Sequence, residues 1–349
     1  MEMINLVNQW KRGICVSIWF TVCYGFIFGL TPNHTYAQTT TDLPVLKVGV
    51  LKFGTINWQM DVIKHHKLDI LNNFKLEVRP FASKNASAVA LQSGAVDIIM
   101  TDLFWVSRQR SQGKPYVLMP TVKATGGVYT ATKSTLASLF DGQQRSIGVA
   151  GGSVDKNWLL LKAYAKHQGF KLSKHFKPKF AAPPLLNRFM LAGELDASIN
   201  FWHYNSRLEA AGMHVSLPLK TMLSTLGINN DVPLLGWVFE EQFATESAKL
   251  LKRFMRASFA AKRQLSKYPS EWERIAHLIK AENNAVLQIL QSHYPNTLLT
   301  IFTQIEVKAT QQLFEVYQGL GGHELLGQDT SFDPNIYWSE AKQVWQNQQ

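Results

Sequence analysis

Two stretches of the sequence repeat each other at a constant distance of 99 residues, and this repetition limits the folds open to the chain. A period near 100 residues has the size of a domain and is much longer than the repeat of a solenoid. We therefore expect two structural units built on one plan. The matched segments are 47–55 (KVGVLKFGT) with 146–154 (SIGVAGGSV), 80–82 with 179–181, and 91–102 (LQSGAVDIIMTD) with 190–201 (MLAGELDASINF).

Both units show the same order of predicted elements. In each, a short apolar strand ends in glycines and a helix follows, and then come a strand, a helix and a third strand. Gly94 and Gly193 follow the second helix of their units, where a left-handed C-cap glycine is expected. Strands that alternate with helices predict parallel βαβ units and an α/β fold. The first helices are predicted at 58–66 and 155–167, and the later strands at 76–81, 97–101, 176–181 and 196–200.

The remaining segments indicate how the two units are joined. Strands are predicted at 117–122 and 128–133, the second leading into lobe 2, and a strand at 234–239 returns the chain to lobe 1. We expect each lobe to be a mostly parallel sheet flanked by helices, with a ligand cleft between the lobes. Helices after residue 240 are expected to pack behind lobe 1. The expected division is 44–128 for the first part of lobe 1, 129–230 for lobe 2, and 231–349 for the return and the C-terminal helices.

The first 37 residues have the features of a secretory signal peptide. Lys11 and Arg12 precede an apolar stretch at 14–30, and the small side chains of Thr35 and Ala37 predict cleavage after Ala37. An uncleaved membrane anchor stays open, because the apolar stretch has about the minimum length for a spanning helix. Both cysteines of the chain lie in this leader, so the mature protein has no thiol or disulfide chemistry. We expect it to be a periplasmic protein.

Composition and motifs argue against several function classes. Hydrophobic residues make up 46% and charged residues 17% of the chain, a globular composition, and the formal net charge is +11. The basic residues are densest between Lys162 and Lys179, and no nucleic-acid-binding motif accompanies them. The chain has no nucleophile elbow, phosphate-binding loop or metal-binding histidine motif. We therefore expect no enzyme activity, cofactor, metal ion or nucleic-acid partner.

Four segments carry a family resemblance that covers residues 46–267. These segments resemble the solute-binding proteins of the nitrate/sulfonate/taurine group of ABC importers. The resemblance implies a type II periplasmic-binding-protein fold that closes on a small solute and presents it to an ABC permease, and we expect a monomer. The segments are LKVGVLKFGTINWQMDVIKHHKLD (46–69), ALQSGAVDIIMTDLFW (90–105), GVAGGSVDKNWLLL (148–161) and AGELDASINFWHY (192–204).

The predicted binding residues follow the strands, because ligands of such sheets bind beyond the carboxyl ends of the strands. A strand that leads through glycine into a helix presents backbone N–H groups and a helix dipole to an acidic group. Ser153 is expected to cap the lobe 2 helix, with Asp155 in its first turn. Polar groups mixed with aromatic side chains are typical of small-ligand pockets. The predicted ligand-binding residues are Gly54, Thr55, Asn57, Trp58, Asn85, Thr101, Asp102, Trp105, Gly152, Ser153, Asp155, Asn200, Trp202, His203 and Trp237.

The sequence leaves the identity of the solute open. Thr55, Ser153 and the helix N-termini suit an anionic group, whereas Asp102 suits an amine, so an anionic or zwitterionic organic solute is favoured over a bare ion. Two other functions remain open. One is a periplasmic sensor or scavenger of the same fold. The other is an enzyme similar to the thiamin-pyrimidine synthases, although the cysteine-rich iron motif of that family is absent here.

Overall fold

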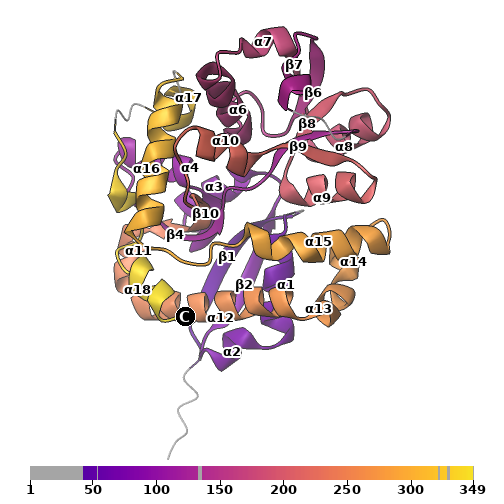
Figure 1. Cartoon of the computed structure of the whole chain (residues 1–349). Coiled ribbons are helices and arrows are strands. Elements are labelled where there is room, and N and C mark those ends of the chain that lie inside the picture. The colour runs from indigo at the N-terminus through magenta and orange to yellow at the C-terminus, as the bar shows by residue number, and fades with distance from the viewer. Residues whose placement is uncertain (1–41, 53, 133–135, 321–322, 328–330, 349) are drawn as a thin grey trace, which may run out of the picture. The chain divides into compact units, whose positions relative to one another are not determined.

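Two mixed β-sheets organise the chain from Leu43 to Gln349, which forms one compact unit (Figure 1). The computed structural model describes residues 42–52, 54–132, 136–320, 323–327 and 331–348; the predicted signal peptide lies outside them. The first sheet has the order β2-β1-β3-β10-β4 and the second has the order β7-β6-β8-β5-β9. The strands are β1 (Val45–Leu51), β2 (Lys75–Phe81), β3 (Ile98–Asp102), β4 (Tyr116–Lys123), β5 (Gly127–Thr130), β6 (Arg145–Val149), β7 (Phe176–Phe180), β8 (Ala197–Ile199), β9 (His214–Pro218) and β10 (Pro233–Glu240).

Helices flank both sheets, and the described elements after β10 are all helices. The helices are α1 (Ile56–His65), α2 (Leu68–Leu71), α3 (Lys84–Gln92), α4 (Leu103–Ser111), α5 (Leu136–Leu139), α6 (Lys156–His167), α7 (Leu172–His175), α8 (Pro183–Leu191), α9 (Trp202–Ala210), α10 (Leu219–Thr225), α11 (Glu241–Glu246), α12 (Ala248–Lys267), α13 (Pro269–Arg274), α14 (Ala276–Ile279), α15 (Asn284–Thr297), α16 (Gln304–Gln318), α17 (His323–Leu326), the 3-10 helix η1 (Pro334–Ile336) and α18 (Ala341–Gln346).

The two sheets have the same topology, as the repeated sequence predicts. In the first, β2, β1 and β3 are parallel, and β10 runs antiparallel to both β3 and β4. In the second, β7, β6 and β8 are parallel, and β5 runs antiparallel to both β8 and β9. The expected α/β class is confirmed. Both sheets are mixed, because β5 and β10, the strands that follow each crossing of the chain from one sheet to the other, run antiparallel to their neighbours.

Equivalent residues of the two repeats make equivalent contacts. The carboxylate of Asp97 accepts from the backbone N–H of Lys47 at 2.7 Å, and 99 residues later Asp196 accepts from Ser146 N–H at 2.7 Å. These bonds join the start of the third strand of each unit to the first strand. Gly94 and Gly193 have φ values of +70° and +73°, as expected for C-cap glycines. The repetition is therefore visible in individual hydrogen bonds and in the strand order.

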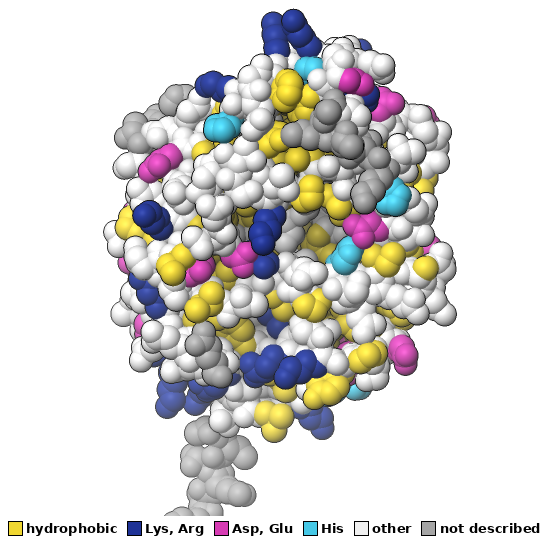
Figure 2. All heavy atoms as spheres, in the orientation of Figure 1, with side chains coloured by type: hydrophobic (Ala, Val, Ile, Leu, Met, Phe, Trp, Pro, Cys, Tyr) yellow, Lys and Arg dark blue, Asp and Glu magenta, His cyan; other side chains and the backbone are white. Residues whose placement is uncertain are grey.

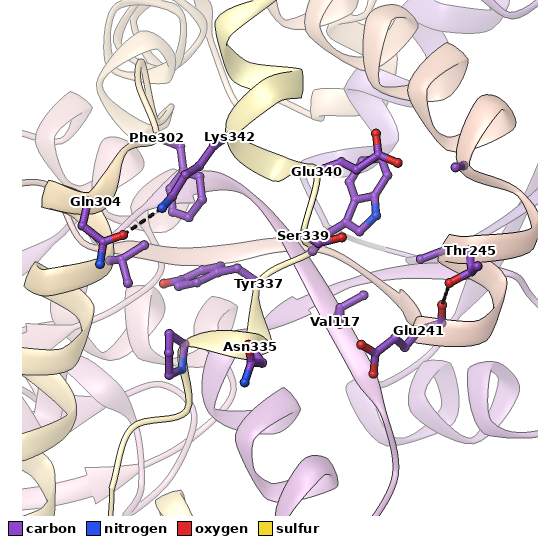
Figure 3. A pocket seen from close by; sticks show the side chains of 15 residues that line it. Val117, Glu241, Thr245, Phe302, Gln304, Asn335, Tyr337, Ser339, Glu340 and Lys342 are labelled. Atoms are coloured by element: carbon purple, nitrogen blue, oxygen red, sulfur yellow. Dashed lines mark hydrogen bonds between the residues drawn. The ribbon is translucent and has the colours of Figure 1, made fainter.

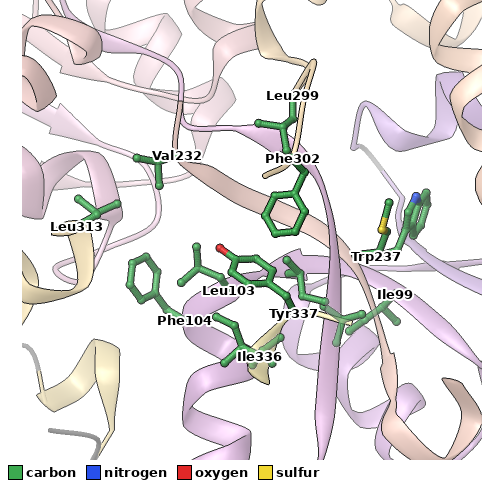
Figure 4. Close-up of a cluster of buried hydrophobic side chains, with 14 of the residues drawn as sticks. Ile99, Leu103, Phe104, Val232, Trp237, Leu299, Phe302, Leu313, Ile336 and Tyr337 are labelled. Atoms are coloured by element: carbon green, nitrogen blue, oxygen red, sulfur yellow. The ribbon is translucent and has the colours of Figure 1, made fainter. Parts of the chain in front are cut away.

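The hydrophobic core of the first sheet includes side chains from the C-terminal third of the chain. Figure 4 shows Leu299, Phe302 and Ile336 in the same cluster as Ile99 and Leu103, all of them buried. The long helix α12 covers α1, burying one face of its 20 residues. The helices after β10 therefore complete the core of the first sheet, and this burial places α15 and α16 beside the second sheet's helices.

The expectation that the C-terminal helices pack only behind lobe 1 was wrong in part. Helix α15 packs against α9, which follows β8 of the second sheet, and α16 contacts α6. The sequence pattern identifies an amphipathic helix but does not show which of two sheets its faces meet. These helices consequently connect the two sheets on two sides, in addition to the crossing strands.

Candidate functional site

The carboxyl ends of β1 and β3 lie near the carboxyl ends of β6 and β8, where side chains from both sheets meet. At the end of β1, the Asn57 side-chain amide donates to the carbonyl oxygens of Leu51 at 2.7 Å and Gly54 at 2.8 Å. These bonds hold the loop between β1 and α1 and use the amide protons of Asn57. Thr55 occupies the N-cap position of α1 without a side-chain capping bond. Thr55 is therefore freer than Asn57 to contact a ligand.

Two predicted tryptophans from different repeats are in contact. Trp58 on α1 and Trp202 at the start of α9 have ring centroids 5.9 Å apart at an interplanar angle of 85°. Trp58 is 5% exposed, and its ring also lies 5.6 Å from that of Trp272 on α13. Edge-to-face aromatic contacts contribute beyond the area they bury. This aromatic contact links an element that follows β1 with one that follows β8.

His203 contributes a buried polar atom without a partner to the same region. Its ring lies 6.4 Å from that of Trp58, and its Nδ1 atom has no hydrogen-bond partner among the described residues. Burial, and to a lesser extent the charge of Arg207, lowers the pKa of His203 to about 3. The imidazole is therefore neutral near pH 7. A buried ring nitrogen that lacks a partner is suited to a hydrogen bond with a bound molecule.

An ion pair joins the two sheets at the end of β3, the strand that pairs with β1. Lys156 Nζ, from α6 of the second sheet, donates to Asp102 Oδ2, at the end of β3, over 2.9 Å. Lys84 Nζ lies 4.0 Å from the same oxygen. Burial raises the pKa of Asp102, but the charges of Lys156 and Lys84 outweigh this effect and lower the pKa to about 2. Asp102 is therefore ionised at neutral pH although it is only 4% exposed.

Asp102 and Asp155 both act as N-caps, which differs from the expectation for the second loop. Asp102 accepts from Trp105 N–H at the start of α4. Asp155 accepts from the N–H groups of Asn157 and Trp158, so α6 begins at Lys156. The prediction that Ser153 caps this helix was wrong, because the chain makes one further turn before the helix starts. Burial raises the pKa of Asp155 above its ordinary range.

Gly151 and Gly152 shape the loop before α6. Their φ values are +94° and +83°, in the left-handed region that favours glycine. A Cβ atom at Gly151 would lie 2.9 Å from Asp155 Oδ2, whereas one at Gly152 would meet nothing within 4 Å. The first glycine therefore makes room for the capping carboxylate. Ser153 follows in an exposed turn.

The structure places several other predicted site residues away from this region or in internal bonds. Trp237 is fully buried in the core of the first sheet, where its indole N–H donates to Ser258 Oγ. Trp105 packs against Tyr116, which lies at the opposite, amino end of β4. The Asn200 side chain bonds to Pro183, Asn187 and Phe201, while Thr101 is buried and Asn85 is exposed at the start of α3.

Three contributors to the site were missed by the sequence analysis. Lys84 and Lys156 supply its cationic groups, and the Tyr317 hydroxyl on α16 donates to the Lys156 carbonyl oxygen at 2.7 Å. Lys156 lies 99 residues after Asn57, so the repeat offset carried a signal for it. Tyr317 had no such signal, because its place depends on where α16 packs. That helix begins with a capping box between Thr303 and Glu306.

A second set of polar contacts connects α15 and the segment before it with α9. His293 Nε2 lies 3.2 Å from Glu209 Oε2, and His293 Nδ1 lies 3.1 Å from Ser206 Oγ. Arg207 Nε also donates to Glu282 Oε1 at 3.1 Å. Polar bonds at two places and an aromatic contact thus join the two halves of the structure. Figure 2 shows that one face of the molecule is hollowed near its centre, with charged side chains beside the hollow.

A separate cavity of about 490 Å³ lies at the edge of the first sheet, against the amino end of β4 (Figure 3). Its wall includes Phe302, Tyr337 and Trp338, and its rim carries Lys342, which donates to Gln304 Oε1 at 2.7 Å. This cavity shares no residue with the aromatic contact or with the ion pair. We find no cluster of potential metal ligands within the described part of the chain.

A helix that spans a membrane needs about 20 predominantly apolar residues. Among the helices that the structure describes, none is both long enough and apolar enough to cross a bilayer.

Comparison with known proteins identifies the fold. No protein-family model and no curated protein sequence matches the chain. Solved structures do match. The periplasmic aliphatic sulphonate binding protein SsuA from Escherichia coli has a TM-score of 0.65 at 16% identity, over 86% of this chain and 99% of that one. The alkanesulfonate-binding protein SsuA from Xanthomonas axonopodis pv. citri, bound to MOPS, has a TM-score of 0.64 at 18% identity, over 85% and 99%.

A third similar structure is the periplasmic nitrate-binding protein NrtA from Synechocystis PCC 6803, with a TM-score of 0.61 at 10% identity over 88% of each chain. At these identities the similarity is one of fold. The expected type II periplasmic-binding-protein fold is therefore confirmed, with each repeat forming the three parallel strands of one sheet.

Proposed function

We propose that the chain is the solute-binding component of an ABC importer. It captures a small organic solute between its two sheets by hinge closure and delivers it to a membrane permease from the periplasm, without changing any bond of the solute. The contact between Trp58 and Trp202 carries this proposal, because it joins residues that follow strands of different sheets. A molecule held at this place touches both halves and so stabilises the closed arrangement. The fold shared with sulfonate- and nitrate-binding proteins supports the same role.

The polar groups around the aromatic contact favour an anionic or zwitterionic solute. Lys84 and Lys156 provide cationic groups, and the buried ring nitrogen of His203 provides a neutral partner. Asp102 provides a carboxylate that stays ionised near neutral pH. An amino sulfonate such as taurine matches this set, with its sulfonate toward the lysines and its ammonium toward Asp102. An alkanesulfonate matches the lysines and tryptophans but leaves Asp102 to Lys156.

A thermal-shift screen of residues 43–349 tests the proposal. Taurine, alkanesulfonates, nitrate and amino acids are added separately, and unfolding is followed by tryptophan fluorescence. A solute at 100 times its dissociation constant adds about 2.7 kcal/mol to the free energy of unfolding. Calorimetry then gives the affinity and stoichiometry, and chromatography of the mixture checks that the solute is recovered unchanged. Stabilisation by a solute that is consumed would argue for an enzyme instead.

Delivery to a permease needs a separate test. Uptake of the labelled solute is measured in cells that contain or lack the gene for this chain. Loss of uptake without the gene supports the transport role. Solute binding without any effect on uptake would favour a sensor or scavenger of the same fold.

A further inference from the structure

One stretch of the chain, in the half of the structure that contains the second sheet, is strongly basic. Residues 156–193 contain eight lysine or arginine residues and no aspartate or glutamate, in a chain whose formal net charge is +11. The stretch runs from α6 through α7 and β7 to α8. Such a long segment with charges of one sign needs an explanation, because solvated faces of soluble proteins usually mix both signs. Lys156 is accounted for by its ion pair with Asp102, and Lys162 is half-buried above the ring of Trp158.

The other six basic residues form an exposed group, which we call the basic edge. All six are exposed, and none forms an ion pair with another described residue. By contrast, the basic helix α12 is tied to the protein by Lys252, which pairs with Glu340, and by Arg256, which donates to Asn72. The basic edge consists of Lys166, Lys171, Lys174, Lys177, Lys179 and Arg188.

The basic edge surrounds the outer strand of the second sheet. Strand β7 lies at the end of the strand order and pairs only with β6 within that sheet. Its residues Lys177, Pro178, Lys179 and Phe180 are all exposed. In Figure 1, α7 and β7 form one end of the body, and Figure 2 shows Lys or Arg side chains that project from this end. Proline and lysine on an edge strand also oppose pairing with another strand, which argues against strand addition by a partner chain.

Apolar side chains accompany the charges. Phe180 is 45% exposed at the end of β7, and Leu191 is 57% exposed at the end of α8. Lys179 Nζ lies 3.6 Å from the centre of the Phe189 ring, so this lysine extends along an aromatic surface. Basic groups with exposed aromatic and aliphatic side chains are suited to the interface between lipid headgroups and acyl chains.

We propose that the basic edge binds the surface of a membrane that contains anionic phospholipids. Five of its six residues are lysines, which act as mobile point charges, whereas recognition of a specific acidic protein surface favours the fixed fork of arginine. Five of the six side chains come from four elements around an outer edge, and Lys171 is the N-cap residue of α7. This spread suits a flat and fluid array of phosphate groups. Binding here would hold a periplasmic protein close to the bilayer through the half that contains the second sheet. The inference is independent of which solute the protein takes.

The test is vesicle co-sedimentation of residues 43–349, the unit with its own core. One set of vesicles contains phosphatidylglycerol mixed with phosphatidylcholine, and the other contains phosphatidylcholine alone. We expect binding to the first set only, decreasing steeply between low and physiological salt. Each basic residue near an anionic surface is worth about fivefold in partitioning. The double variant Lys177→Gln/Lys179→Gln should therefore bind about 25-fold more weakly.

A matched variant separates the basic edge from the net charge of the protein. Lys249 and Lys267 are exposed on α12, and the variant Lys249→Gln/Lys267→Gln removes the same two charges. We expect it to bind the anionic vesicles like the unaltered protein. Equal losses for the two variants would overturn the proposal, and so would absence of binding to anionic vesicles. Binding to a poly-glutamate peptide without binding to lipid would overturn it in favour of an acidic protein partner. Thermal unfolding checks that both variants are folded.

Discussion

Lys156 and Asp102 form an ion pair of 2.9 Å that joins the first helix of one repeat to the third strand of the other. Asp102 is also the N-cap of α4, and the Lys156 carbonyl oxygen accepts from the Tyr317 hydroxyl. The pair therefore ties together both sheets and a C-terminal helix at the place where a solute is proposed to bind. Separation of the sheets requires that this pair be broken and both groups be rehydrated. The ion pair is thus suited to hold the sheets together when no solute is bound.

Replacement of Lys156 by methionine should loosen this arrangement. The change keeps roughly the length of the side chain but leaves the Asp102 carboxylate with Lys84, 4.0 Å away, as its remaining cationic partner. We expect the free energy of unfolding to fall by about 2 kcal/mol, less than for a fully buried pair because the sheets can separate and admit water. Small-angle X-ray scattering should show a larger radius of gyration than for the unaltered protein. An unchanged radius would mean that the pair does not hold the sheets together.

The stability of the protein should depend on Asp102 in the acid range. The pKa of Asp102 is about 2 in the folded protein, below the value of 3.8 for an unperturbed aspartate. A depressed carboxylate pKa stabilises the fold above the unfolded-state value, and this contribution is lost as the pH falls from about 4 to about 2. Asp102→Asn keeps a capping oxygen for α4 but removes the charge. We expect it to be less stable than the parent by about 2 kcal/mol above pH 5, with a gap that closes near pH 2.

A matched control for this titration is Asp231→Asn. Asp231 pairs with Lys123 at 2.9 Å, but its side chain is 42% exposed. Exposed pairs contribute little, so this variant should follow the parent across the same pH range. Urea unfolding at several pH values measures both variants. A constant gap between Asp102→Asn and the parent would show that the carboxylate charge is not the source of the difference.

The sequence predicted the repeated architecture well because short-range patterns encode it. The strand–glycine–helix pattern repeats at a fixed offset, and the bonds of Asp97 and Asp196 show that equivalent residues kept equivalent tasks. The site was harder to predict. Trp58 and Trp202 were predicted because they follow strands. Trp237 was predicted from its place on the return strand, but that strand runs antiparallel to β3 and the Trp237 ring lies in the core. Contacts such as Tyr317 with Lys156 depend on helix packing, which local patterns do not encode.

The two glycines before α6 should respond differently to substitution. Gly151→Ala places a Cβ atom 2.9 Å from Asp155 Oδ2, the second oxygen of the carboxylate whose Oδ1 caps α6, in addition to the strain of a left-handed alanine. Gly152→Ala has the backbone strain alone, since nothing lies within 4 Å. We expect losses of about 2–3 kcal/mol for Gly151→Ala and about 1 kcal/mol for Gly152→Ala, from the cost of strain and of a weakened N-cap. Thermal unfolding measures both, and equal losses would contradict the role given to the Asp155 cap.

Substitutions at Trp202 and Trp237 should have different effects, the first on ligand binding and the second on stability. Trp202→Ala removes a ring at the boundary between the sheets, and we expect it to weaken binding of any solute found in the screen by tenfold or more. Trp237→Phe removes the bond to Ser258 in the core, and it should lower the melting temperature while the solute still adds the same stabilisation. Calorimetry measures the affinities. Weakened binding in Trp237→Phe together with unchanged binding in Trp202→Ala would contradict the proposed site.

Because Lys262 is buried, the free energy of unfolding should increase as the pH rises above neutrality. Its side chain is 5% exposed, its Nζ donates to the Thr121 carbonyl oxygen at 3.1 Å, and burial lowers its pKa to about 7. The unfolded chain holds this proton up to about pH 10, whereas the folded chain releases it near pH 7. The unfolded state therefore binds more protons between these pH values, and the free energy of unfolding increases with rising pH.

Lys262→Met removes the buried amine, and the Thr121 oxygen keeps Leu299 N–H as a donor at 3.2 Å. We therefore expect this variant to be more stable than the parent at pH 7, by up to about 4 kcal/mol, and to lose that advantage toward pH 10. Urea unfolding between pH 6 and pH 10 measures the difference, and a variant that is less stable at pH 7 would show that the ammonium is better accommodated than its surroundings indicate.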